Sequence, residues 1–198
     1  MAIITSNKHP GAGLTTLVDM LRRQAEKQPD EVLFTFLVDG ESEEYSMTYG
    51  DLDRNARGIA AWLQDHHAEG ERALLLYPPG LDYISAYFGC LYAGVIAVPA
   101  YPPRLNRPVP RIQGIVADSS SRFALTTNEI LKNLEQRFEY TPDLQALTWL
   151  DTQQRPVGAE SAWKQPAIGP DTLAFLQYTS GSTSQPKGVM VTHANLLY

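Results

Sequence analysis

The sequence has little that would tie the chain to a membrane, to nucleic acid or to an oxidising compartment. It contains one cysteine, Cys90, and therefore cannot form an internal disulfide, as is typical of proteins from reducing compartments. Its formal net charge of −6 leaves no excess of positive charge to attract nucleic acid. No run approaches the ~20 apolar residues of a membrane span, and the first apolar run is too short for a signal peptide. These absences predict a cytoplasmic protein without a membrane span or a nucleic-acid partner.

The chain also lacks the side-chain groupings of several common active sites. It has no Gly-x-Ser-x-Gly segment, the nucleophile elbow of serine hydrolases. His66 and His67 lie at a predicted helix end without partners at metal-ligand spacing, so we expect no metal site made by protein side chains. Cys90 falls in an apolar helical stretch and is expected to be a core thiol. His193 is expected either to face a nucleotide or to have a structural role. Exposed helix faces are expected for Asp51 and Asp53, and packing roles for Tyr83, Tyr87, Tyr92 and Tyr101.

A regular alternation of helix and strand patterns runs along the chain. Its 198 residues, 43% of them hydrophobic, are enough for one large domain or two small ones. Apolar residues at helical spacing alternate with short apolar runs that are bounded by Pro and Gly. This alternation predicts an α/β fold with a doubly wound, mainly parallel sheet. An N-terminal helix and a β-hairpin, which is marked by Asp39-Gly40, are expected before that sheet.

The expected elements follow from these patterns. Residues 1–13 are expected to form a loose lead, and residues 152–170, with three prolines and two glycines, a surface connector. We expect helices over residues 14–25, 52–63, 81–91, 112–116 and 130–138, and strands over 33–38, 44–49, 73–77, 95–98, 123–126, 147–150 and 173–176.

The segment YTSGSTSQPKG at residues 178–188 is the most informative stretch. It follows an apolar strand pattern and precedes a helix for which Thr192 is the expected N-cap. Backbone N–H groups and hydroxyls of such a loop can surround anionic oxygens, and Lys187 adds a positive charge. The segment therefore predicts a polyphosphate cradle made by a strand, a loop and a helix start. It does not fit the Walker pattern, because Pro186 precedes the lysine and Gly188 follows it.

This segment resembles the phosphate-binding signature of the acyl-adenylate-forming superfamily, whose members include acyl-CoA synthetases, peptide-synthetase adenylation domains and fatty acyl-AMP ligases. Ser184 departs from the pattern, since most members have Gly there. Two weaker segments occur in the expected order: MTYGDL at residues 47–52 and LYAGVIAVP at residues 91–99. The resemblance implies that the chain is the front part of the large N-terminal domain of such an enzyme, with the C-terminal domain absent.

The resemblance also implies a chemistry, which is the activation of a carboxylate by ATP and Mg²⁺ to give acyl-AMP. Lys187 would orient the loop or neutralise charge, and Gly188 would let the backbone turn close to the ligand. The family's catalytic residues are expected beyond Tyr198, so this chain alone is expected to be inactive. The residues implied to bind the ATP phosphates are Thr179, Ser180, Gly181, Ser182, Thr183, Ser184, Lys187 and Gly188.

Within the superfamily, the chain is most similar to fatty acyl-AMP ligases. Residues 98–103, residues 110–113 and the whole loop over 176–184 carry this narrower resemblance. It implies a fatty acid as the substrate and an acyl carrier protein as the acceptor. The alternatives that stay open are an acyl-CoA synthetase, a peptide-synthetase adenylation domain and a non-catalytic nucleotide-binding remnant.

Overall fold

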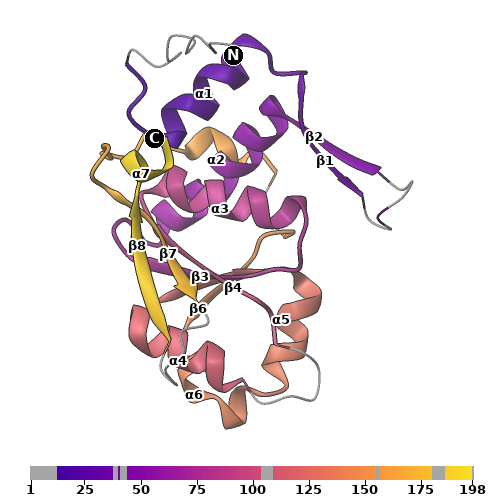
Figure 1. The fold of residues 1–198 in the computed structure, drawn as a ribbon. Coiled ribbons are helices and arrows are strands. Elements are labelled where there is room, and N and C mark those ends of the chain that lie inside the picture. Colours follow the sequence, from indigo (N-terminus) through magenta and orange to yellow (C-terminus); the bar gives the residue numbers. More distant parts are fainter. Residues whose placement is uncertain are drawn as a thin grey trace, which may run out of the picture.

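The fold was analysed in a computed structural model, which shows a six-stranded sheet between two layers of helices (Figure 1). The structure describes residues 13–37, 40, 44–103, 109–154, 157–179 and 186–197. The first half contains α1 (Leu17–Lys27), β1 (Val32–Leu37), β2 (Glu44–Thr48), α2 (Tyr49–Asp65), β3 (Arg72–Leu76), α3 (Leu81–Ala93) and β4 (Ile96–Ala100). The second half contains α4 (Pro110–Ser119), β5 (Phe123–Thr126), α5 (Asn128–Glu135), α6 (Pro142–Gln145), β6 (Thr148–Asp151), β7 (Leu173–Thr179), β8 (Lys187–Thr192) and α7 (His193–Leu197).

The strand order of the main sheet is β6-β5-β3-β4-β7-β8. The strands from β6 to β7 are parallel, and only β8, among the strands described, pairs antiparallel within this sheet. From β3 the chain crosses to β4 through α3, and from β4 it returns through α4 to β5, on the other side of β3. The direction in which the chain moves across the sheet thus reverses after β4. The expected doubly wound, mainly parallel sheet is confirmed.

The two faces of the sheet are buried by different helices. Side chains of β3 alternate between them, since Leu75 joins the cluster under α1, α2 and α3 whereas Leu74 and Leu76 join the cluster under α4, α5 and α6. This alternation is the two-residue period of a strand, and burial on both sides is typical of parallel sheets. Figure 1 shows the two helical layers above and below the strands.

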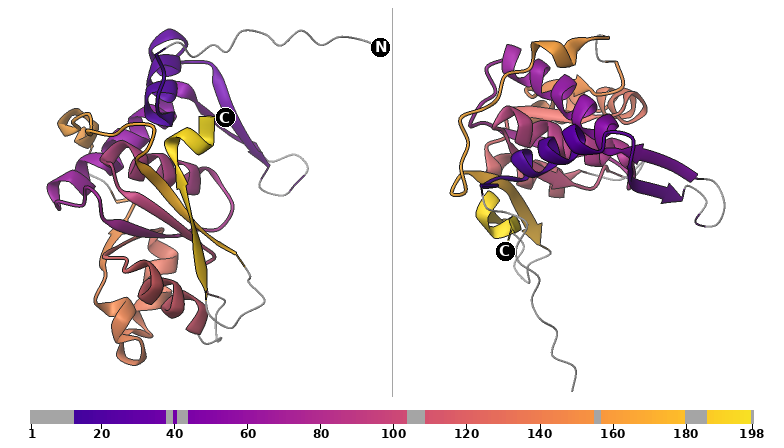
Figure 2. Two further views of the ribbon diagram at one scale, coloured as in Figure 1. Left: turned by 60° about the vertical axis from the view of Figure 1, so that its left-hand side comes forward. Right: turned by 90° about the horizontal axis from the view of Figure 1, so that it is seen from above.

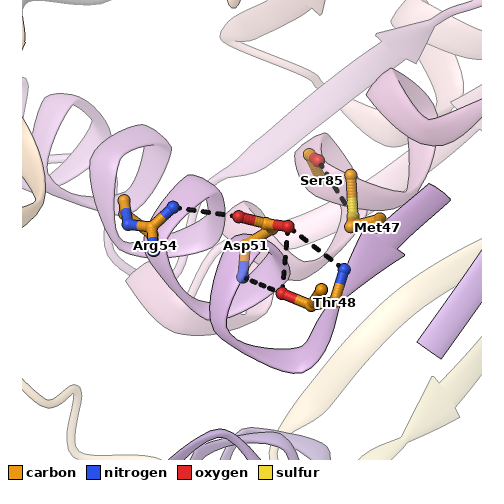
Figure 3. Close-up of polar contacts among 5 residues, drawn as sticks. All are labelled: Met47, Thr48, Asp51, Arg54 and Ser85. Carbon is orange, nitrogen blue, oxygen red and sulfur yellow. Dashed lines mark hydrogen bonds and ion pairs between the residues drawn. The ribbon is translucent and has the colours of Figure 1, made fainter. Parts of the chain in front are cut away.

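The expected N-terminal helix and hairpin are also present, and the hairpin projects from the body of the molecule (Figure 2). Helix α2 begins directly after β2 because Thr48 and Asp51 form a capping box (Figure 3). The Asp51 amide donates to Thr48 Oγ1 at 3.1 Å, and Asp51 Oδ2 accepts from the Thr48 amide at 3.2 Å. Burial raises the pKa of Asp51, but hydrogen bonds from Thr48 and Arg54 outweigh it and leave the pKa below its usual value. The segment MTYGDL therefore has a structural role here.

Two parts of the chain differ from the sequence-based expectation. Strand β8 was not expected, and it pairs with β7 as an antiparallel hairpin. The helix expected over residues 130–138 ends at Glu135 and is followed by a 3-10 turn at Phe138–Tyr140 and by α6. In the segment expected to be a connector, a 3-10 turn at Ala159–Ala162 leads to Trp163, whose Nε1 donates to the Tyr92 carbonyl at 2.7 Å. Within the described residues, no helix combines the length and the apolar character needed to cross a bilayer.

Helices α2 and α3 approach closely at Gly89, and this contact generates a stability prediction. A Cβ placed on Gly89 would lie 2.5 Å from Ile59 Cγ2 and 2.6 Å from Ile59 Cβ, which is completely buried. Overpacking costs about 1–3 kcal/mol, whereas the better helix propensity of Ala returns about 1 kcal/mol. Both Ile59 atoms lie close to its backbone and cannot easily move away, so the overpacking cost should fall at the upper end, about 3 kcal/mol. We therefore expect Gly89→Ala to lower the free energy of unfolding by a net of about 2 kcal/mol in urea denaturation.

The matched control is Gly169→Ala, since no atom lies within 4 Å of a Cβ at that position. This control should stay within about 0.5 kcal/mol of the wild type. A Gly89→Ala variant as stable as the wild type would contradict the close packing of α2 on α3.

Candidate phosphate-binding site

The hydroxyl-rich loop begins and ends on two paired strands. It leaves β7 at Thr179 and returns through Pro186 to Lys187, the first residue of β8. Tyr178 pairs with Gly188, and Thr179 pairs with Lys187, so the two loop ends are held side by side. Since β7 runs parallel to β4 and β3, both described ends of the loop lie at the edge of the sheet where these strands have their carboxyl ends. Ligands of doubly wound sheets bind at this edge.

The structure corrects the expected strand-loop-helix cradle. The loop joins two antiparallel strands, and the helix α7 begins at the far end of β8. Six strand residues at ~3.3 Å each separate that helix start from the loop by about 20 Å. The helix N-terminus therefore does not face the loop. Thr192 does cap α7 as expected, because the Asn195 amide donates to its Oγ1 at 3.3 Å.

The candidate phosphate-binding residues fall partly within the described chain. Thr179 and Lys187 are exposed where the loop begins and ends. Gly188 lies inside β8, so the turn expected at this residue is absent. The remaining candidates, which lie outside the described residues, are Ser180, Gly181, Ser182, Thr183 and Ser184.

Helix α4 packs against both ends of this loop. The Tyr178 hydroxyl donates to Asp118 Oδ2 at 2.5 Å, and the Tyr178 side chain is only 6% exposed. Burial, followed by the hydrogen bond to Asp118, raises the pKa of Tyr178, so the phenol keeps its proton and donates it. A Cβ on Gly188 would lie 3.0–3.2 Å from Tyr178 ring and hydroxyl atoms. The lack of a side chain at Gly188 thus makes room for this tyrosine.

An open pocket of about 350 Å³ lies where β3, β4 and β7 end, beside the strand end from which the loop leaves. It is mainly aromatic and apolar, with Arg111 and Gln177 as polar groups. Tyr101 is 83% exposed and lines this pocket, so the packing role expected for it is wrong. In the sequence, prolines that follow predicted strands mark where these strands end. Nothing in that pattern identifies Arg111 or Gln177 as pocket residues. The lining residues are Tyr77, Pro78, Pro79, Tyr83, Pro99, Ala100, Tyr101, Arg111, Ile115, Gln177 and Tyr178.

The other candidate residues have structural roles. Asp53 was expected on an exposed face but is buried, where it accepts from the Tyr92 hydroxyl at 2.9 Å and from Arg57 Nε at 2.8 Å. Cys90 is fully buried, and burial raises the pKa of its thiol, so the expected core role is confirmed. His66 caps the end of α2 and stacks on Trp62, with 3.8 Å between the ring centroids.

His193 does not face the loop, because it is buried at the start of α7 against α1. Its Nδ1 accepts from the Leu17 amide at 3.4 Å and thereby satisfies one free N–H group at the start of α1. Burial lowers the pKa of His193, while the nearby Asp19 carboxylate acts in the opposite direction. The alternative of a structural role for this histidine is the one that the geometry supports.

The fold and the loop place the chain among α/β proteins that carry a hydroxyl-rich loop at the carboxyl edge of a doubly wound sheet. Residues 21–198 match the family model of AMP-binding enzymes. The chain belongs to the AMP-binding enzyme family. This membership confirms the resemblance to acyl-adenylate-forming enzymes.

Among curated relatives, the chain is 45% identical over 188 residues to the medium-chain-fatty-acid–[acyl-carrier-protein] ligase JamA of Moorena producens, covering 93% of this chain and 32% of JamA. It is 34% identical over 185 residues to the long-chain-fatty-acid–AMP ligase FadD23 of Mycobacterium tuberculosis, covering 92% of this chain and 32% of FadD23. The chain therefore spans about a third of the length of these curated relatives.

A solved structure of the fatty acyl-adenylate ligase from Legionella pneumophila, in complex with acyl adenylate and pyrophosphate, has the same fold over this region. Its TM-score is 0.86 at 40% sequence identity, and the match covers 97% of this chain and 33% of the ligase. The chain thus corresponds to the N-terminal part of an acyl-adenylate-forming enzyme.

The buried imidazole of His193 generates a prediction for the dependence of stability on pH. Its pKa is lowered in the folded state from a usual value of 6.5, so the unfolded chain binds the proton more readily. The contribution of neutral His193 to stability is fully present above about pH 6.5 and is lost as the pH falls toward the lower folded pKa. We expect His193→Gln to flatten the fall in unfolding free energy between pH 7.5 and 5, measured by urea denaturation.

One proton can change the unfolding free energy by at most about 1.4 kcal/mol per pH unit, which sets the upper limit of this slope. Asn195→Ala is the control, because it removes the side-chain oxygen that accepts from the Thr192 amide and hydroxyl at the same helix start and leaves the imidazole in place. This control should keep the wild-type slope. An equal slope in His193→Gln and the wild type would contradict the prediction.

Proposed function

We propose that this chain is the ATP-phosphate-binding part of a fatty acyl-AMP ligase, an enzyme that activates a fatty acid as acyl-AMP. The observation that carries the proposal is the position of the loop: Thr179 and Lys187 stand at its two ends, at the carboxyl edge of the sheet and beside an open pocket. The 40% identity to a fatty acyl-adenylate ligase, whose solved structure holds acyl adenylate and pyrophosphate, supports the same proposal.

In the proposed reaction, a carboxylate oxygen of the fatty acid attacks the α-phosphorus of ATP. A new carboxyl–phosphate bond forms, the bond between the α- and β-phosphates breaks, and pyrophosphate leaves with the negative charge. Catalysis of this step needs positioning and charge stabilisation rather than a protein nucleophile. Thr179, Gly188 and residues 180–184 would hold the β- and γ-phosphates through N–H and hydroxyl groups, and Lys187 would neutralise charge on the leaving pyrophosphate.

Mg²⁺ is proposed to accompany the phosphates of ATP. Within the described residues, no three His, Cys, Asp or Glu side chains gather where they could hold one metal ion. Mg²⁺ in nucleotide sites keeps several water ligands and binds phosphate oxygens together with one or two carboxylates, so it does not require a cage of protein ligands. A metal held mainly by water and phosphate oxygens would enter with the nucleotide and neutralise the phosphate charge.

An acyl carrier protein is the proposed acceptor of the acyl group. The 45% identity to JamA, which is named as an acyl-carrier-protein ligase, supports this choice over free coenzyme A. Since the chain spans about a third of its relatives, the activity and both substrates are proposed for a protein that continues these residues to the length of the relatives. That protein is called the full-length ligase below.

The substitution Lys187→Ala tests the proposed reaction. Loss of one charge-assisted contact to the phosphates is worth about 1.5–3 kcal/mol, which is a factor of about 10–150 in rate. We expect the full-length ligase to exchange pyrophosphate into ATP in the presence of a C12 fatty acid, and Lys187→Ala to lower this rate by that factor. Lys132→Ala, on the exposed side of α5, is the control and should match the wild type.

A separate transfer assay, in which the full-length ligase receives ATP, Mg²⁺, the C12 fatty acid and one of the two acceptors, decides the acceptor. Holo carrier protein should become acylated, while free coenzyme A should leave acyl-AMP to accumulate. Efficient formation of acyl-CoA would instead assign the protein to the acyl-CoA synthetases. A rate unchanged by Lys187→Ala would mean that the loop is not the phosphate site.

A further inference from the structure

We infer that Asp118 and Tyr178 form a positioning pair that holds the ends of the loop in place for the phosphates of ATP. The inference rests on the proposed function, and it assigns a role in that function to a residue of α4 and to the β7 residue just before Thr179. It starts from two contacts between helix α4 and the paired loop ends, and from one contact between the two ends themselves.

The first contact is the hydrogen bond between Tyr178 and Asp118. It joins the residue just before the loop to a helix 60 positions earlier in the chain, at a donor–acceptor distance of 2.5 Å. The tyrosine is buried among apolar side chains of α4 and neighbouring elements, whereas Asp118 lies on the exposed side of the helix. The ring is thus fixed by packing, and its hydroxyl is directed at a carboxylate.

Glycine takes part in the other two contacts. Gly188, which pairs with Tyr178 across the β7–β8 ladder, lies close to the ring and hydroxyl atoms of the tyrosine. Gly114 lies against Pro186, since a Cβ at that position would come within 3.1 Å of Pro186 Cγ. Pro186 is the last described residue before β8, so this contact fixes the end at which the loop returns.

The two contacts made by α4 come from one side of that helix. Gly114 and Asp118 are four residues apart in α4 and therefore lie on the same helix face, one turn from each other. This face touches the outgoing strand through Tyr178 and the returning segment through Pro186. Helix α4 therefore acts as a platform that fixes both ends of the loop relative to the sheet.

Fixed loop ends matter for the proposed reaction because backbone N–H groups must meet phosphate oxygens within a few tenths of an ångström. If Tyr178 loses its hydrogen bond, the ladder pairs next to the loop lose a lateral support while the core of the sheet stays intact. The affinity for ATP should then fall more than the stability of the fold. Neither Asp118 nor Tyr178 needs to touch ATP for this effect.

The test uses Tyr178→Phe, Asp118→Ala, Asp118→Asn and the double variant Tyr178→Phe/Asp118→Ala in the full-length ligase. Because Asp118 is partly solvated, we expect a loss of about 5- to 10-fold on removing the bond. The KM for magnesium ATP should rise by this factor in Tyr178→Phe and Asp118→Ala, while the KM for the fatty acid stays unchanged. Asp118→Asn keeps an acceptor oxygen and should stay near the wild type, and the double variant should be no worse than either single one.

Tyr92→Phe is the matched control, because the Tyr92 hydroxyl also donates to a carboxylate, that of the buried Asp53. This pair lies on the opposite face of the sheet from the loop ends. Tyr92→Phe should lower the thermal stability without raising the KM for magnesium ATP. Equal KM values in Tyr178→Phe, Asp118→Ala and the wild type would overturn the inference. So would an Asp118→Asn variant as impaired as Asp118→Ala.

A second measurement separates this inference from the proposed function. Amide hydrogen exchange of residues 178–179 and 187–188 can be followed in the 198-residue chain without nucleotide. Tyr178→Phe should speed exchange at these amides about 5- to 10-fold, and Tyr92→Phe should not. If the full-length ligase used no ATP, the proposed function would fail. Faster exchange in Tyr178→Phe would still show that α4 holds the loop ends in place. Unchanged exchange would overturn it.

Discussion

Burial of both faces of β3, β4 and β5 is the constraint on which the rest of the structure depends. Side chains of these strands alternate between the two helical layers, and both layers exclude water from the sheet. Polar groups that must meet a ligand are therefore confined to the ends of the strands. The carboxyl ends of β3, β4 and β7 meet at one edge, where the open pocket lies and where the hydroxyl-rich loop leaves β7.

Much of this arrangement could be predicted from the sequence, because strands buried on two sides and amphipathic helices have distinct periods. The runs that became β3 and β5 were predicted within one residue of their observed bounds. Strand β8 was missed because the residues between Gly188 and Thr192 do not alternate between apolar and polar. The strand is recognised only by its hydrogen-bonded pairing with β7, which a local sequence pattern does not reveal. As a result, the helix start was expected beside the loop when it lies at the other end of β8.

The candidate site divides in a similar way. Hydroxyls, glycine and lysine concentrated in one segment indicated a phosphate loop, since their chemistry can be read from residue type alone. The contribution of α4 could not be predicted, because Asp118 and Tyr178 are 60 residues apart and meet only when β7 packs over that helix. Asp53 was misplaced for the same reason: its buried partner Tyr92 comes from the neighbouring helix α3. The features that could not be predicted from residue patterns are thus those that depend on contacts between residues far apart in the sequence.

The most direct test of the central claim is peptide-level hydrogen exchange of the full-length ligase with and without magnesium pyrophosphate. Pyrophosphate isolates the part of ATP that the loop is proposed to hold, without contributions from the base, the ribose or the acyl group. The account predicts slower exchange in peptides that cover residues 176–190 and no change in the projecting β1–β2 hairpin. Saturable protection elsewhere in the protein, with unchanged exchange over residues 176–190, would contradict it.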